Sequence, residues 1–172
     1  MEKRIVELGE ICKFEYGTNL PGRIRVPGAV PVYGSNGVIG THSTAITSGP
    51  TIIIGRKGSI GEIHQSNQPC WPIDTTYFID ESFTDCDLDW LTYQLIHLNL
   101  CRLNKASGVP GLNREDAYKL EVILPSIEQQ RSIAAYLKAQ LTIVEEARIA
   151  AKAQLQEIEQ LPSRLLAQAF ET

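Results

Sequence analysis

The chain has 172 residues, of which 43% are hydrophobic and 21% are charged, so a globular domain with an appendage is expected and wholesale disorder is not. The net charge of −4 argues against a uniformly basic nucleic-acid binder. No apolar run reaches the roughly 18 residues of a transmembrane helix, and the charged first eight residues lack the apolar stretch of a signal peptide. We therefore expect a cytoplasmic protein that does not associate with a membrane.

Charge is unevenly distributed along the sequence. Residues 16–67 carry four cations and one acid, whereas residues 74–89 carry six acids and no base. A local basic patch can meet phosphates, with modest and salt-sensitive affinity. The four cysteines form no C-x-x-C pair and the three histidines are scattered, so we expect reduced thiols rather than disulfides or a metal site.

Glycines and prolines divide residues 1–125 into short segments, which favours a strand-rich domain. The apolar runs at 29–33, 38–39, 51–54 and 75–80 predict strands, the third of them β-branched throughout. Residues 55–58, with glycines on both sides of two cations, predict a turn between 51–54 and a returning strand at 59–64.

Helices are predicted toward the end of this domain. Residues 87–103 have apolar side chains at helical spacing, and Asp87 or Asp89 is suited to begin the helix. Asn113 is suited to cap a short helix that runs toward Leu120. A last strand at 120–124 is then closed by Pro125.

Residues 126–172 change character and predict one long helix. Ser126 and Gln129 form a capping-box pattern, and neither glycine nor proline follows until Pro162. A helix of about 35 residues is roughly 50 Å long, longer than the roughly 30 Å width of a small domain. Pro162 is expected to interrupt it, leaving a short amphipathic segment at 163–170.

A heptad pattern runs along this predicted helix. Apolar residues alternate three and four positions apart from Ala134 onward, which is typical of a coiled-coil seam. Arg148 is the exception, within reach of Glu145 in its own helix or of an acid on a partner. The seam predicts pairing with another helix; folding back onto its own domain is the alternative. The predicted dimerisation residues are Leu137, Leu141, Val144, Ala151, Leu155 and Ile158.

Catalytic motifs are missing from the sequence. It contains no G-x-S-x-G, no P-loop and no G-x-G-x-x-G, and the glycines at 55, 58 and 61 lack the G-K-[ST] ending of a phosphate loop. The [DN]-P-P-[YF] signature of amino-methyltransferases is also absent. The acids at 74–89 match no calcium loop. We therefore predict a protein that is not an enzyme, with no catalytic residues and no metal.

Five segments occur in an order that resembles one known family. They are PVYGSNGVIG at 31–40, TIIIGRKGSIG at 51–61, WPIDTTY at 71–77, GVPGLN at 108–113 and LPSIEQQRSIA at 124–134. Together they resemble the target recognition domain and the following helix of the specificity (S) subunit of type I restriction–modification enzymes. The ending LPSRLLAQAF at 161–170 fits the close of the same helix.

The resemblance implies the fold and the partners. The fold implied is α+β, with a target recognition domain at 1–125 and a spacer and dimerisation helix at 126–172 that forms an antiparallel coiled coil. A full S subunit has two such domains and two helices, so this chain resembles a half-subunit that pairs with a second copy. The implied partners are double-stranded DNA, the adenine methyltransferase (modification) subunit, which binds S-adenosylmethionine, and the restriction subunit. This chain itself would hold no cofactor.

Two identical readers on a twofold frame predict a palindromic target in two parts. Loop residues that combine glycine-rich backbone with cations and polar groups are the candidates to meet DNA. Ordinary surface or turn roles remain open for each of them. The candidate DNA-binding residues are Arg23, Arg25, Tyr33, Ser35, Asn36, Arg56, Lys57, Ser59, Lys105, Ser107 and Asn113.

Two other functions remain open at this point. The chain is alternatively a protein-interaction module, which the acidic net charge favours and which predicts no DNA binding. It is otherwise a truncated specificity fragment that binds the methyltransferase without productive recognition. An enzyme acting alone would need turnover without any partner, and no motif predicts that.

Overall fold

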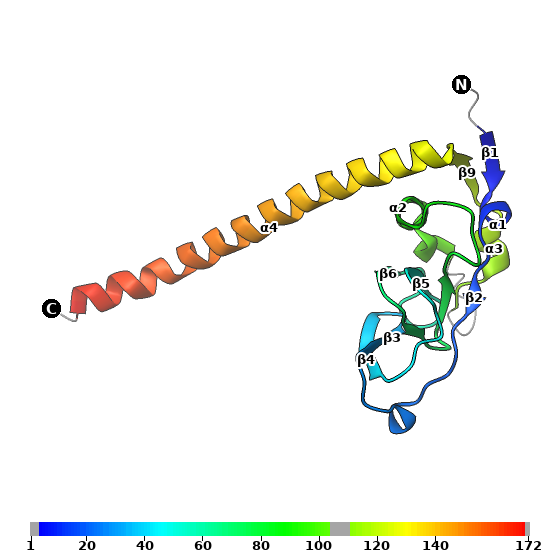
Figure 1. The fold of residues 1–172 in the computed structure, drawn as a ribbon. Helices are drawn as coiled ribbons and strands as arrows, with labels where there is room; N and C mark the ends of the chain where they lie inside the picture. Colours follow the sequence, from blue (N-terminus) through cyan, green and yellow to red (C-terminus); the bar gives the residue numbers. More distant parts are fainter. Residues whose placement is uncertain (1–3, 104–110, 171–172) are drawn as a thin grey trace. The chain divides into compact units, whose positions relative to one another are not determined.

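The computed structural model describes residues 4–103 and 111–170, and the chain folds as two compact units, Met1–Arg131 and Ser132–Thr172. Strands and short helices make up the first unit, and a single long helix continues through the second (Figure 1). This confirms the predicted α+β class. No helix in the described ranges is long and apolar enough to cross a membrane.

A four-stranded antiparallel sheet forms the centre of the first unit, in the order β2 (Glu15–Tyr16), β8 (Thr76–Ile79), β5 (Thr51–Gly55) and β6 (Ile63–Ser66). Every residue of β5 is buried, because β5 is an inner strand whose two faces are both covered, as its unbroken β-branched run predicts. The β5–β6 hairpin is confirmed. Its second strand begins at Ile63 rather than at the predicted Ser59, because residues 56–62 form the connecting loop.

Two smaller sheets flank this centre. In one, β3 (Val30–Gly34) pairs with β4 (Gly37–His42) as an antiparallel hairpin and with β7 (Trp71–Pro72) in parallel. In the other, β1 (Arg4–Glu7) pairs with β9 (Glu121–Leu124), which joins the two ends of the first unit. The strands predicted at 29–33, 38–39, 75–80 and 120–124 are thus confirmed within a residue or a few, whereas β1 was not predicted.

Helix α2 (Leu88–Leu98) covers the central sheet with buried Trp90, Leu91 and Leu95. Asp87 caps its start by accepting a hydrogen bond from the Trp90 N–H at 2.9 Å. The predicted extension to Leu103 is wrong, because Asn99 takes a left-handed conformation with φ of 51° that ends the helix. A separate 3₁₀ turn, η2 (Leu100–Leu103), follows.

Three short helical segments complete the first unit: α1 (Leu8–Ile11), the 3₁₀ turn η1 (Gly22–Ile24), and α3 (Arg114–Tyr118). Asn113 caps α3 as predicted, and its side-chain oxygen accepts a hydrogen bond from the Glu115 N–H at 2.9 Å.

The long helix α4 (Ile127–Phe170) has 44 residues. Its predicted capping box is confirmed: the Ser126 N–H donates to Gln129 Oε1 at 3.1 Å, and the Gln129 N–H donates to Ser126 Oγ at 3.4 Å. Gln130 is buried, and its Oε1 accepts a hydrogen bond from the Asp87 N–H at 2.8 Å. The first turn of α4 is therefore fixed to the first unit by side-chain contacts.

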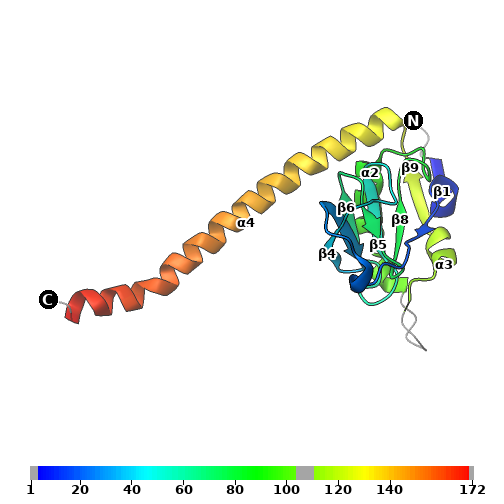
Figure 2. The same ribbon diagram turned by 60° about the horizontal axis from the view of Figure 1, so that its bottom comes forward.

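The expected interruption at Pro162 is wrong, because α4 continues through this residue to Phe170. A proline inside a helix loses one hydrogen bond and crowds the carbonyl four residues earlier, which bends a helix when the turns on both sides keep their own bonds. The helix axis changes direction in its orange-to-red part (Figure 2).

Candidate nucleic-acid interface

The loop from Gly55 to Gly61 between β5 and β6 is shaped by its glycines. Gly58 and Gly61 have φ angles of 80° and 73°, which side chains disfavour. A Cβ on Gly55 would lie 1.9 Å from the Ser59 carbonyl oxygen, and one on Gly61 would lie 2.4 Å from the Cys101 nitrogen. Both backbone approaches therefore require glycine.

Segments from distant parts of the chain pack against this loop. The Thr75 carbonyl accepts hydrogen bonds from the N–H groups of Arg56 (2.9 Å) and Lys57 (3.1 Å). The Arg56 carbonyl accepts from the Leu112 N–H at 2.9 Å. Ser35 Oγ, in the β3–β4 turn, lies 3.3 Å from the place where a Cβ on Gly58 would be. The loop is thus the point where these segments converge.

Several predicted DNA-binding residues are brought together here. Ser35 and Asn36 form the β3–β4 turn, and Asn36 is exposed. Lys57 is exposed and Ser59 is half-buried within the 55–61 loop. Asn113 follows Leu112 directly, although its side-chain oxygen is used to cap α3. Lys105 and Ser107 lie outside the described residues.

Arg56 differs from Lys57 in its surroundings. Its guanidinium donates to the Asp74 carbonyl and lies over the rings of Tyr16 and Tyr77, 5.2 and 5.7 Å from their centroids. Its Nε is buried with no hydrogen-bond partner in the structure. Arg56 therefore holds the loop onto the central sheet, whereas Lys57 presents its charge to solvent.

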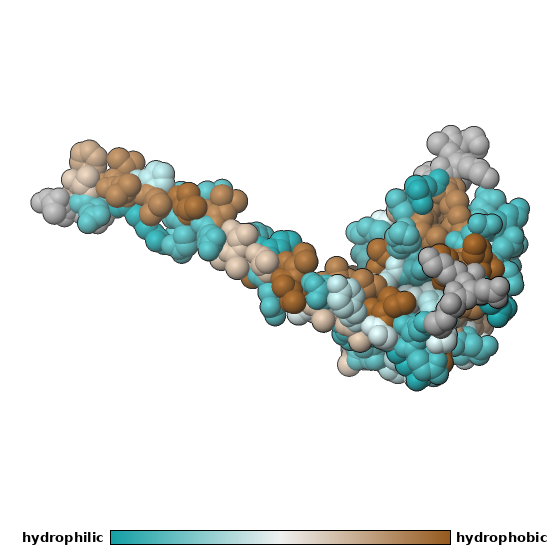
Figure 3. Space-filling view, turned by 90° about the horizontal axis from the view of Figure 1, so that it is seen from above, coloured by the Kyte–Doolittle hydropathy of each residue, from teal (hydrophilic) through white to brown (hydrophobic). Residues whose placement is uncertain are grey.

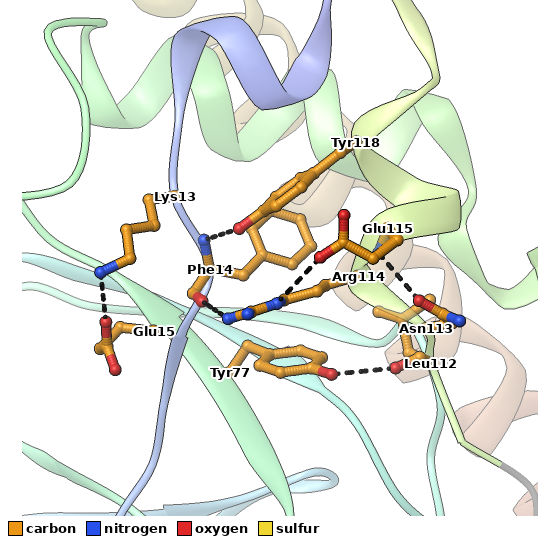
Figure 4. A network of polar contacts seen from close by, with 9 residues as sticks. All are labelled: Lys13, Phe14, Glu15, Tyr77, Leu112, Asn113, Arg114, Glu115 and Tyr118. Atoms are coloured by element: carbon orange, nitrogen blue, oxygen red, sulfur yellow. Dashed lines mark hydrogen bonds and ion pairs between the residues drawn. The ribbon is translucent and has the colours of Figure 1, made fainter.

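Tyr16 and Arg114 belong to the same neighbourhood and were missed by the sequence analysis. The Arg114 guanidinium lies 5.2 Å from the Tyr16 ring centroid, so two arginines contact this one ring. Figure 4 shows Arg114 reaching from α3 toward Phe14, whose carbonyl accepts its hydrogen bond at 3.5 Å. No local pattern predicts this cluster, because its members come from β2, β5–β6 and α3.

An open pocket of about 460 Å³ lies over this cluster, lined by Tyr16, Tyr77 and residues 111–115. The Tyr77 hydroxyl donates to the Leu112 carbonyl at 3.1 Å. Burial raises the pKa of Tyr77 to about 12, so its hydroxyl keeps its proton at neutral pH. The pocket wall is therefore polar and neutral at Tyr77 and cationic at Arg114.

The remaining predicted residues lie around the β3–β4 sheet. Arg23 is exposed in η1. Arg25 is half-buried and donates from Nε to the Leu20 carbonyl (3.2 Å) and from Nη1 to the Ile39 carbonyl (2.9 Å), which ties η1 to β4. Tyr33 is half-buried in β3, and its carbonyl accepts from the Ile73 N–H at 2.9 Å. These positions form a second group around the β3–β4 sheet.

The acidic segment at 74–89 has structural roles. Asp87 caps α2, and Asp80 Oδ1 accepts from the Ser82 N–H at 2.9 Å. Asp89 Oδ1 accepts from Gln65 Nε2 at 2.6 Å. Across residues 4–103 and 111–170, no group of three or more His, Cys, Asp or Glu side chains is placed to hold a metal ion.

Comparisons with known proteins agree on one family. The family model described as "Type I restriction modification DNA specificity domain" matches residues 2–160. The EcoprrI type I restriction enzyme specificity subunit of Escherichia coli is 28% identical over 136 residues, which are 76% of this chain and 34% of that protein. This chain therefore spans about a third of the length of that relative.

Solved structures show the same fold. The type I S subunit from M. genitalium superposes with a TM-score of 0.70 at 23% identity, over 84% of this chain and 41% of that one. The HsdS subunit from Thermoanaerobacter tengcongensis superposes with a TM-score of 0.64 at 23% identity, over 92% and 43%. With its strand-rich unit, its long helix and a family match over most of its length, the chain belongs to the type I restriction–modification DNA specificity domain family.

Proposed function

We propose that this chain reads a DNA sequence for a type I adenine methyltransferase complex, as a half specificity subunit that pairs with a second copy. The observation that carries this proposal is the convergence at the 55–61 loop. There a glycine-shaped backbone, the exposed Lys57 and the Ser35–Asn36 turn lie together.

This arrangement suits the two parts of DNA recognition. Exposed cations and backbone N–H groups contact phosphates and fix the register, and polar side chains on neighbouring loops read base edges. Lys57 is the phosphate contact in this proposal, and Ser35, Asn36 and Ser59 are the base-reading candidates. Arg56 acts by holding the loop in place.

The remaining functions are divided among partners. The modification subunit supplies S-adenosylmethionine and the methyl transfer, the restriction subunit supplies nuclease activity, and this chain supplies recognition without catalysis. Residues 1–125 read DNA, and residues 126–172 form the spacer and dimerisation helix. Two copies paired through this helix would supply the two readers of a two-part palindrome.

Sequencing of methylated bases tests this proposal. Host cells would express the chain with a type I modification subunit from the same source, and N6-methyladenine would be mapped across the genome. We expect one motif with two inverted half-sites, and no such motif when the chain is omitted. Replacing both Asn36→Ala and Ser59→Ala should reduce methylation at the motif, whereas Arg4→Ala, in the separate β1–β9 sheet, should not.

Two results would overturn the proposal in different ways. An asymmetric two-part motif would contradict the pairing of identical copies. Co-purification with the modification subunit without any methylation would instead favour a fragment that binds the methyltransferase and recognises no DNA.

A further inference from the structure

The coiled-coil seam of α4 is exposed over most of its length in the single chain. Leu141, Val144, Leu155 and Ile158 are 51%, 62%, 55% and 60% exposed. The seam is already covered at its start, where Gln130 and Ala134 are each 4% exposed. Hydrophobic side chains gather along one flank of the outer half of the helix (Figure 3). The open seam therefore begins near Leu137.

One line of positions beside the seam carries alternating charges. In heptad terms the seam residues occupy positions a and d, and the residue after each d occupies position e. Along α4 the e positions from 138 onward are Lys138, Glu145, Lys152 and Glu159, each seven residues from the last. The g positions on the other side are Gln140, Ala147, Gln154 and Leu161, none of them charged. Charges beside a seam set partner choice and orientation.

This alternation is self-complementary in only one orientation. Two antiparallel helices bring e positions against e positions, whereas two parallel helices bring e against g. Parallel pairing would place each charge of this line beside an uncharged residue. Antiparallel pairing can match every lysine with a glutamate of a second copy.

We infer that the partner of this seam is a second, antiparallel copy of α4, in the register that places Lys138 opposite Glu159 and Glu145 opposite Lys152. The inference rests on the pairing of two copies in the proposed function and adds its register and the residues that select it. In this register the seam residues that lie opposite each other have numbers adding to 299, so the twofold axis passes between Ile149 and Ala150. The e positions flank the seam rather than lying in it, so their pairs have numbers adding to 297.

The same register fits the length of the helix and its apolar residues. The axis of this register lies about one residue from the midpoint of Ile127–Phe170, and it lets the open seam at 137–162 of one copy run beside the same residues of the other. Leu141 then lies opposite Ile158 of the second copy, and Val144 opposite Leu155. If one copy were shifted along the other by one heptad in either direction, Lys152 would face a lysine and Glu145 would face a glutamate. Both like-charge pairs would repel and destabilise the dimer.

Arg148, the one charged seam residue, is accommodated in this register. It lies opposite Ala151 of the second copy, whose small side chain leaves room for the arginine stem. Its guanidinium already binds both oxygens of Glu145 at 2.7 Å. That hydrogen bonding holds the pKa of Glu145 below its ordinary value, so the carboxylate is ionised at neutral pH and also faces Lys152 of the second copy.

Two charge swaps of identical composition test the register. Lys152→Glu with Glu159→Lys makes every e–e pair a like-charge pair. Lys138→Glu with Glu159→Lys moves the same charges and keeps every pair opposite. Sedimentation equilibrium of the full chain should show dimerisation about 10- to 100-fold weaker for the first variant and unchanged for the second. High salt should bring the dimerisation affinities of the two variants closer together, because it screens the charges.

Disulfide trapping reports the register directly, in a Cys101→Ser background that removes the exposed native thiol. Leu141→Cys with Ile158→Cys should give a covalent dimer on oxidation. Leu141→Cys with Ala151→Cys, which reports the register displaced by one heptad, should not. Within one helix residues 141 and 158 are about 25 Å apart, too far for a bond that needs roughly 7 Å or less between Cα atoms.

The outcomes separate this inference from the proposed function. A dimer that crosslinks through the displaced pair, or that responds equally to the two charge swaps, overturns the register and leaves the paired half-subunit standing. A wild-type chain that stays monomeric overturns the pairing itself.

Discussion

The two units of this chain bury their apolar residues to very different extents. In the first unit Ile52, Ile53, Ile54, Leu91 and Leu95 are all fully buried, so the unit has a core of its own. In α4 the residues from 138 to 170 are all exposed, although many of them are leucine, isoleucine or valine. The first unit is therefore organised by its own core, whereas the helix presents a surface that a partner would complete.

The largest expected effect comes from replacing one leucine of each unit by alanine. Leu91→Ala should lower the free energy of unfolding of the first unit by about 2–5 kcal/mol, because it leaves a cavity in a closed core. Leu155→Ala should leave that unfolding unchanged and weaken dimerisation instead. Tryptophan fluorescence during urea unfolding measures the first unit alone, since Trp71 and Trp90 both lie in it. If Leu91→Ala and Leu155→Ala lowered the free energy of unfolding of the first unit equally, the contrast between a closed core and an exposed helix would be wrong.

The 55–61 loop offers a second test of how tightly the first unit is packed. Gly61→Ala should lower the free energy of unfolding by about 1–3 kcal/mol, because the φ of 73° at this position disfavours a side chain and the new Cβ would meet the Cys101 backbone. Gly22→Ala is the matched control, since nothing lies within 4 Å of its Cβ position. Thermal unfolding of both variants measures the difference. A Gly61 variant as stable as the Gly22 variant would mean that the loop is loosely held.

A smaller effect is expected on DNA binding, which we propose for the first unit. With the modification subunit present, Lys57→Ala should weaken binding to a duplex of random sequence by less than about tenfold. It should also make the slope of log affinity against log salt concentration shallower by roughly one, because one phosphate contact is lost. Arg4→Ala should leave the salt dependence unchanged. Fluorescence anisotropy across a salt series measures both. An unchanged slope for Lys57→Ala would remove this residue from the interface.

The smallest effect concerns the thiols, which all lie in the first unit. Burial raises the pKa of Cys12 to about 12 from an ordinary value of 9.0, whereas Cys101 is exposed. At pH 8 iodoacetamide should label Cys101 well before Cys12, as peptide mass spectrometry would show. Because the unfolded thiol ionises more easily, the stabilisation from burying Cys12 is complete below about pH 9 and is lost as the pH rises toward 12. Equal labelling rates would contradict a closed core.

Local sequence patterns predicted the elements that local chemistry controls. The β-branched run of β5, the capping box of α4 and the Asn113 cap were all identified from adjacent residues, and the structure confirms each. The end of α2 was missed because Leu100 and Leu103 continue the apolar spacing beyond Asn99, so the left-handed turn had no signal. The helix-breaking effect of Pro162 was overestimated, because a long helix keeps its hydrogen bonds on both sides of a bend.

The candidate site was harder to predict because it is assembled from distant segments. The sequence indicated the glycine loop and Lys57, but it did not indicate that the Arg56 guanidinium lies over the rings of Tyr16 and Tyr77. Strand β1 was missed for the same reason, since its partner β9 lies more than a hundred residues away. The exposed line of apolar residues along α4 was predictable because its heptad spacing is local, and its role as a coiled-coil seam stays a prediction.

The mass of the full chain in solution, measured by light scattering, tests most directly the claim that α4 is completed by a second copy. The wild-type chain should have about twice its 19.1 kDa, and Leu141→Glu with Leu155→Glu should return it to 19.1 kDa while the tryptophan fluorescence of the first unit stays the same. A wild-type monomer, or a dimer that survives both substitutions, would contradict the account.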